Sequence, residues 1–182
     1  MHAVRESRFK TGDRVLVIGA GPIGMLTAFV LRISGASKVF MIEPNEERYK
    51  FAKNLGFKAF RNEEELKDEL PEGSADLVFE AVGIGPTMDT AVKYCRIKGQ
   101  IVVVGVFKKP IPVELQRISF CEIGIIGVRV YRDYDFVISA QMLADHPEIG
   151  AVITHRMPFE EAKQAFLTIK KGGPAMKLLL HP

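Results

Sequence analysis

The stretch Arg14-Val15-Leu16-Val17-Ile18-Gly19-Ala20-Gly21-Pro22-Ile23-Gly24 decides the fold of this chain. An apolar run leads directly into the pattern G-x-G-x-x-G, and apolar residues at helical spacing follow it. In this pattern Gly19 permits a tight turn, Gly21 lets the backbone approach a pyrophosphate, and Gly24 lets the helix pack closely on the sheet. Pro22 suits the first turn of that helix, where no N–H is needed. The stretch therefore predicts a strand, a phosphate-binding turn and a helix whose N-terminus attracts an anion.

An acidic residue lies at the distance that this pattern requires. Glu43 ends a second apolar run, 38–42, about 20 residues beyond the glycines, where a carboxylate accepts hydrogen bonds from the adenosine ribose. A carboxylate there repels a 2′-phosphate, so Glu43 favours NAD over NADP. The alternative for Glu43 is a helix-capping or solvated residue at the end of a strand.

Strands and helices alternate along the rest of the chain. The apolar runs predict strands at 14–18, 38–42, 57–60, 75–82, 100–105 and 122–130, a short extended stretch at 151–154 and a last strand at 176–180. Helices are expected between them, including 86–96, which contains Cys95, and 132–144 and 159–171. Asn45 and Asn62 are expected to cap the helices that follow them. Because the strands are almost continuously apolar, the fold class is α/β, a doubly wound parallel sheet of Rossmann type with helices on both faces.

Composition excludes several classes of protein. The 182 residues suit one domain, and 47% of them are hydrophobic. The net charge of +3 gives no reason to expect nucleic acid or a membrane surface as a partner, and no apolar run is long enough to span a membrane. The two isolated cysteines and the absence of an apolar leader indicate a reducing, cytoplasmic location. The scattered Cys and His residues lack metal-ligand spacing, so no metal site and no catalytic residue are expected in this chain.

Four segments together resemble the medium-chain dehydrogenases, and within them the zinc-type alcohol and polyol dehydrogenases of the sorbitol, butanediol and threonine dehydrogenase kind. These segments are Gly12-Asp13-Arg14-Val15-Leu16-Val17, Phe79-Glu80-Ala81-Val82-Gly83, Gly99-Gln100-Ile101-Val102-Val103-Val104-Gly105 and Ile153-Thr154-His155-Arg156-Met157-Pro158-Phe159-Glu160-Glu161-Ala162. The resemblance implies an NAD(H)-binding domain of an enzyme that oxidises a secondary alcohol to a ketone, passing hydride to NAD. It divides the chain into a linker-helix remnant at 1–12, a Rossmann domain at 13–155 and a helix–strand extension of that domain at 156–182.

The resemblance also assigns the cofactor-binding residues. Besides the glycine turn and Glu43, it places Arg48 beside the adenine, although a solvated helix arginine is an equal alternative. The carboxyl ends of two strands would border the cofactor, and a third segment would offer backbone groups to its carboxamide. The two strand ends are Ala81, Val82 and Gly83, which border the cofactor, and Val104, Gly105 and Val106, which meet the nicotinamide. The segment that offers backbone groups to the carboxamide is Val128 and Arg129.

The N-terminal catalytic domain of this family, which supplies the zinc ligands, has no counterpart in the sequence. The chain is therefore expected to bind NAD without catalysis, as an excised domain, a truncated product or one half of a split enzyme with a separate catalytic domain as partner. The resemblance also implies a homodimer through the edge strand near 122–130. Three alternatives stay open: a zinc-independent quinone reductase relative, an S-adenosylmethionine methyltransferase, and a freestanding NAD-binding, sensor or assembly subunit.

Overall fold

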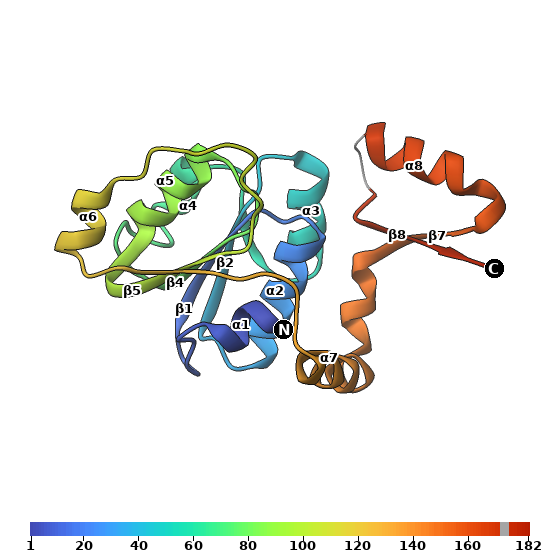
Figure 1. Cartoon of the computed structure of the whole chain (residues 1–182), viewed down its shortest axis with the longest axis horizontal. Helices are drawn as coiled ribbons and strands as arrows, with labels where there is room; N and C mark the ends of the chain where they lie inside the picture. Colours follow the sequence, from blue (N-terminus) through green and yellow to red (C-terminus); the bar gives the residue numbers. More distant parts are fainter. Residues whose placement is uncertain (172–174) are drawn as a thin grey trace.

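The computed structural model describes residues 1–171 and 175–182 (Figure 1). It contains a six-stranded parallel sheet of order β3-β2-β1-β4-β5-β6. This order is that of a Rossmann fold, so the predicted fold class is confirmed. A separate two-stranded parallel sheet follows near the C-terminus. The strands are β1 Arg14–Ile18, β2 Lys38–Ile42, β3 Lys58–Phe60, β4 Ala75–Glu80, β5 Cys95–Val103, β6 Gly124–Gly127, β7 Ile153–Pro158 and β8 Lys177–His181.

Helices pack on both faces of the large sheet, except for the last helix, which packs on the small C-terminal sheet. They are α1 His2–Glu6, α2 Pro22–Ile33, α3 Glu46–Asn54, α4 Glu63–Leu66, α5 Gly85–Tyr94, α6 Leu115–Phe120, α7 Asp133–Asp145 and α8 Ala162–Lys171, with 3₁₀ turns η1 Pro147–Val152 and η2 Phe159–Glu161. Successive side chains of a strand point to opposite faces. Val15 and Val17 accordingly pack in one buried cluster with Phe29 of α2, whereas Leu16 and Ile18 pack in another with residues of α4 and α5.

Local signals in the sequence set the beginnings of three helices, as predicted. Pro22 is the first residue of α2. The side chain of Asn45 accepts a hydrogen bond from the backbone N–H of Arg48 at 3.1 Å. The side chain of Asn62 accepts one from the N–H of Glu65 at 3.0 Å. Each asparagine satisfies a donor that the helix itself leaves free.

The prediction for the strand at 100–105 was wrong at both ends. β5 begins at Cys95, so Cys95 is a strand residue and not a helix residue, and the strand ends at Val103. Cys95 pairs with Ala75 while Gln100 pairs with Leu77, so the register shifts between these pairs. Lys98 in this irregular stretch has a φ of 60°. The apolar residues before Cys95 continue at helical spacing, so nothing in the sequence indicated that the helix ends and the strand begins there.

Two further differences lie beyond β5. The strand predicted at 122–130 is only Gly124–Gly127, and Val128 and Arg129 follow it in a loop. The helix α6 was not predicted, because the prolines before it indicated only a loop.

The C-terminal part forms a small unit of its own, to the right of the large sheet in Figure 1. The short extended stretch predicted at 151–154 is the end of η1 and the beginning of β7. Within the described part of the chain, β7 pairs with β8 alone, in parallel, and α8 lies between them in the sequence. β7 spans the boundary expected at 155, and we propose that the extension starts at Ile153. Within the described ranges, no helix has both the length and the apolar character needed to cross a bilayer.

Candidate dinucleotide-binding site

A cavity of about 580 Å³ lies where the chain order of the sheet reverses, between β1 and β4. Ligands of open α/β sheets bind outside the carboxyl ends of the strands at such a switch point. Eight of the residues expected at the cofactor line this cavity: Gly19, Gly21, Pro22, Ile23, Glu43, Arg48, Ala81 and Val82. The structure thus brings together the glycine turn, the end of β2 and the end of β4.

A second cavity, of about 480 Å³, adjoins the same helix start. Four of the five residues expected at the nicotinamide end line it: Val104, Val106, Val128 and Arg129. Ile23 lines both cavities, so the two meet at the first turn of α2. Together they provide an elongated path across the carboxyl edge of the sheet.

Three of the expected glycines line neither cavity but permit close approaches behind the walls. A Cβ on Gly24 would lie 1.9 Å from the carbonyl oxygen of Gly19. A Cβ on Gly83, whose φ is +89°, would lie 2.6 Å from the carbonyl oxygen of Val106. A Cβ on Gly105 would lie 2.4 Å from Glu80 Oε2. These positions cannot hold a larger residue without moving the backbone that shapes the cavities.

Glu43 is neither solvated nor a helix cap. Its side chain is buried, although it lines the first cavity. Oε2 accepts a hydrogen bond from the N–H of Ala20 at 2.8 Å, and Oε1 accepts one from the N–H of Asn45 at 2.9 Å. The carboxylate therefore fixes the glycine turn against the end of β2. Each carboxylate oxygen keeps a further lone pair with which to accept a ligand hydroxyl.

Two arginines bring positive charge to the first cavity. Arg48 Nη1 lies 3.8 Å from the position that a Cβ on Gly21 would take, so the guanidinium reaches the glycine turn. Arg61 lines the same cavity and pairs with Glu65 at 2.6 Å. Arg61 was not predicted, since nothing in its local sequence distinguishes it from a surface arginine.

Glu80, at the end of β4, is the main residue that sequence analysis missed. It is completely buried, and Oε1 accepts hydrogen bonds from the N–H groups of Val82 and Gly83 and from the hydroxyl of Thr87, at 2.8 to 2.9 Å. Among the described residues, Oε2 has no hydrogen-bond partner. Glu80 thereby fixes the loop after β4, which borders the first cavity. The available signal was an acidic residue inside the apolar run 75–82.

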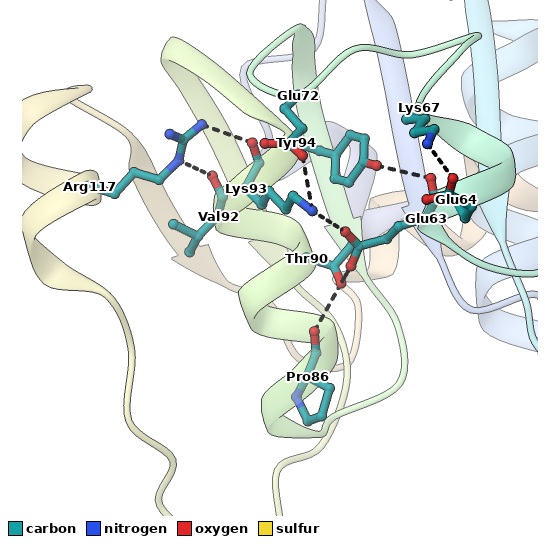
Figure 2. A network of polar contacts seen from close by, with 10 residues as sticks. All are labelled: Glu63, Glu64, Lys67, Glu72, Pro86, Thr90, Val92, Lys93, Tyr94 and Arg117. Carbon is teal, nitrogen blue, oxygen red and sulfur yellow. Dashed lines mark hydrogen bonds and ion pairs between the residues drawn. The ribbon is translucent and has the colours of Figure 1, made fainter.

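Glu63 and Thr90 on the wall of the first cavity belong to a network of polar contacts between α4, α5 and α6 (Figure 2). Glu63 accepts hydrogen bonds from the Thr90 hydroxyl at 2.6 Å and from the Lys93 ammonium at 2.7 Å. Partial burial opposes ionisation, but these donors still hold the pKa of Glu63 below its ordinary value. Arg117 donates to the carbonyls of Val92 and Lys93 and ties α6 to the end of α5. The wall is thus held in place before any ligand arrives.

The described residues do not form a zinc site. Within 1–171 and 175–182, no group of three or more His, Cys, Asp or Glu side chains is placed to hold a metal ion. Both cysteines are free thiols, and burial raises the pKa of Cys95 to about 12.

The strand order and the glycine turn define a Rossmann-type α/β protein. The model of the zinc-binding dehydrogenase family matches residues 22–145, and the chain belongs to this family.

Individual relatives agree with this assignment. L-idonate 5-dehydrogenase of Vitis vinifera is 28% identical over 193 residues, covering 100% of this chain and 53% of that protein. A sorbitol dehydrogenase of Halalkalibacterium halodurans is 33% identical over 191 residues, covering 100% and 55%. The crystal structure of 2R,3R-butanediol dehydrogenase from Bacillus subtilis superposes with a TM-score of 0.89 at 26% identity, covering 100% of this chain and 54% of that one. The chain therefore spans about half the length of the relatives that it matches.

Proposed function

We propose that this chain is the NAD(H)-binding half of a zinc-dependent alcohol or polyol dehydrogenase. The observation that carries the proposal is the pair of cavities that meet at Ile23, at the start of α2. One is lined by the glycine turn and a buried carboxylate, and the other is lined by apolar residues that follow β5 and β6. The first suits the adenosine and pyrophosphate, and the second suits the nicotinamide.

In this proposal each part of the chain has a defined task. The N-terminus of α2 faces the pyrophosphate with free N–H groups, and Arg48 adds a positive charge beside the glycine turn and the adenosine. Glu43 accepts hydrogen bonds from the ribose hydroxyls and disfavours a 2′-phosphate. Val104, Gly105 and Val106, with the backbone of Val128 and Arg129, hold the nicotinamide ring and its carboxamide. The cofactor itself supplies the hydride chemistry between a secondary alcohol and a ketone.

Relatives named as sorbitol and L-idonate 5-dehydrogenases support a polyol or a related sugar acid as the substrate class. A zinc ion would need ligands beyond the described residues, from a catalytic domain. The chain alone is therefore expected to bind cofactor without oxidising alcohol. Its free thiols support a reducing, cytoplasmic location.

Calorimetric titration of the purified chain with NADH and NADPH tests the proposal. Binding of NADH in preference to NADPH is the expected result. Failure to bind either cofactor would contradict it, as would formation of NADH from NAD and a secondary alcohol by the chain alone.

The proposal includes a homodimer through β6. This strand is the last in the order of the large sheet, and Ile125 on it is 43% exposed. Light scattering should give twice the chain mass, and Ile125→Lys should give the monomer. A monomeric parent chain would refute the dimer.

A further inference from the structure

We propose that a buried ionic contact between α1 and α7 positions the loop at 128–132 for the nicotinamide end of the cofactor. The contact, which we call the α1–α7 clasp, consists of His2, Arg5 and Asp135. The inference rests on the proposed function, and it assigns to these residues a positioning role that neither the sequence pattern nor the glycine turn indicates.

The clasp is centred on one buried carboxylate. The Asp135 side chain is 2% exposed. Its Oδ2 accepts the backbone N–H of Arg132 at 2.8 Å and lies 2.7 Å from His2 Nδ1, which must donate because a carboxylate only accepts. The guanidinium of Arg5 donates to Oδ1. The Arg132 N–H, with Arg5 and His2 beside it, lowers the pKa of Asp135 to about 2.

Two further contacts join the same helices. The Arg5 guanidinium lies 4.8 Å from the centre of the Tyr134 ring, on α7. Arg132 pairs with Glu6 of α1 at 3.2 Å. The start of α7 is therefore held against α1 by several charged contacts, of which only those of Asp135 are buried.

The clasp forms part of the wall of the second cavity. His2 and Asp135 line that cavity together with Val128, Arg129 and Val130, and neither lines the first cavity. Loss of the clasp is thus expected to affect the part of a ligand that lies in the second cavity, and not the part at the glycine turn.

The loop between β6 and α7 contains a strained residue, so contacts on both sides are needed to hold it in place. Val130 has a φ of +63°, a conformation that a β-branched residue adopts only under constraint. On one side, the N–H of Val128 donates to the carbonyl of Val103 at 3.1 Å. On the other side, the N–H of Arg132 donates to Asp135. The strained residue is held between these two anchors, and releasing the clasp would let the loop relax away from the cavity.

ADP-ribose separates a positioning role from a merely structural one, because it carries the adenosine, pyrophosphate and second ribose but no nicotinamide. The experiment compares dissociation constants for NADH and ADP-ribose by calorimetry in the parent chain, in Asp135→Asn and in the control Asp133→Asn. Asp133 is exposed and lies in the first turn of the same helix. In Asp135→Asn we expect NADH to bind about tenfold more weakly and ADP-ribose to bind as before, since about 1.4 kcal/mol corresponds to tenfold. The control should match the parent chain.

His2→Ala keeps Arg5 and Arg132 on the carboxylate and serves as a milder variant if Asp135→Asn does not fold. It should weaken NADH about threefold and leave ADP-ribose unchanged, as expected for loss of one hydrogen bond. Equal weakening of both ligands, or of neither, would overturn the positioning role. Equal affinity of the parent chain for NADH and ADP-ribose would overturn it too, while leaving the proposed function standing. Failure of the parent chain to bind ADP-ribose would remove the proposed function itself.

Discussion

Replacing Glu43 with alanine should destabilise the folded chain even without cofactor, because the carboxylate accepts two backbone N–H groups. The N–H of Ala20 is buried and would lose its only acceptor among the described residues, which costs about 1–3 kcal/mol. The N–H of Asn45 is part-buried and can turn to water, so its loss costs about 1 kcal/mol. The free energy of unfolding should therefore fall by about 2–4 kcal/mol, which lowers the melting temperature by about 5–15 °C for a chain of this size.

Urea and thermal unfolding followed by circular dichroism measure this change. Glu47→Ala is the matched control, because Glu47 is exposed in the first turn of α3, four residues after Glu43. Glu43→Gln should lose about half as much, since one oxygen still accepts an N–H. If Glu43→Ala unfolds at the temperature of the control, the carboxylate does not hold the glycine turn, and the argument fails.

Three further predictions concern backbone strain, acid and thiol chemistry. Gly83→Ala should lower the free energy of unfolding, measured in urea, by about 1–3 kcal/mol more than Gly12→Ala does. Both glycines have a positive φ, but only Gly83 is crowded by another backbone segment, so equal losses would contradict the prediction. The fold lowers the pKa of Asp135 from 3.8 to about 2, so the stability that this carboxylate contributes is complete above pH 3.8 and is lost as the pH falls toward 2. Asp135→Asn should therefore flatten the plot of unfolding free energy, measured in urea, against pH in this range, and a plot parallel to that of the parent chain would refute the effect. Cys95, buried with a pKa of about 12, should not react with a disulfide reagent until urea unfolds the chain, whereas the partly exposed Cys121 should react in the native state. Immediate reaction of both thiols would show that Cys95 is not buried.

The sequence predicted those features whose causes are local. The strand β1, the turn after it and the start of α2 follow from residues that are adjacent in the chain. The asparagine caps of α3 and α4 likewise depend on a donor only three residues away. Glu43 was predicted at the site, because its distance from the glycines is fixed by a strand and a helix.

The remainder depends on contacts between distant residues. His2 and Asp135 are 133 residues apart, and no periodicity relates them. The role of Glu80 could not be predicted, because its hydrogen bonds depend on how the following loop folds back. Cys95 was assigned to a helix because a register shift between β4 and β5 leaves no mark in the spacing of apolar residues.

The small sheet of β7 and β8 has a consequence for how the molecule unfolds. Two strands alone are marginally stable in water, and here they are joined by α8, on which Phe166 is 73% exposed. This unit should open separately from the large sheet, in a local equilibrium of low free energy. Amide hydrogens of β7 and β8 should therefore exchange with solvent much sooner than those of β1 and β4. Unfolding free energies derived from the whole chain then describe the large sheet, while proteases should first cut the chain within this C-terminal unit.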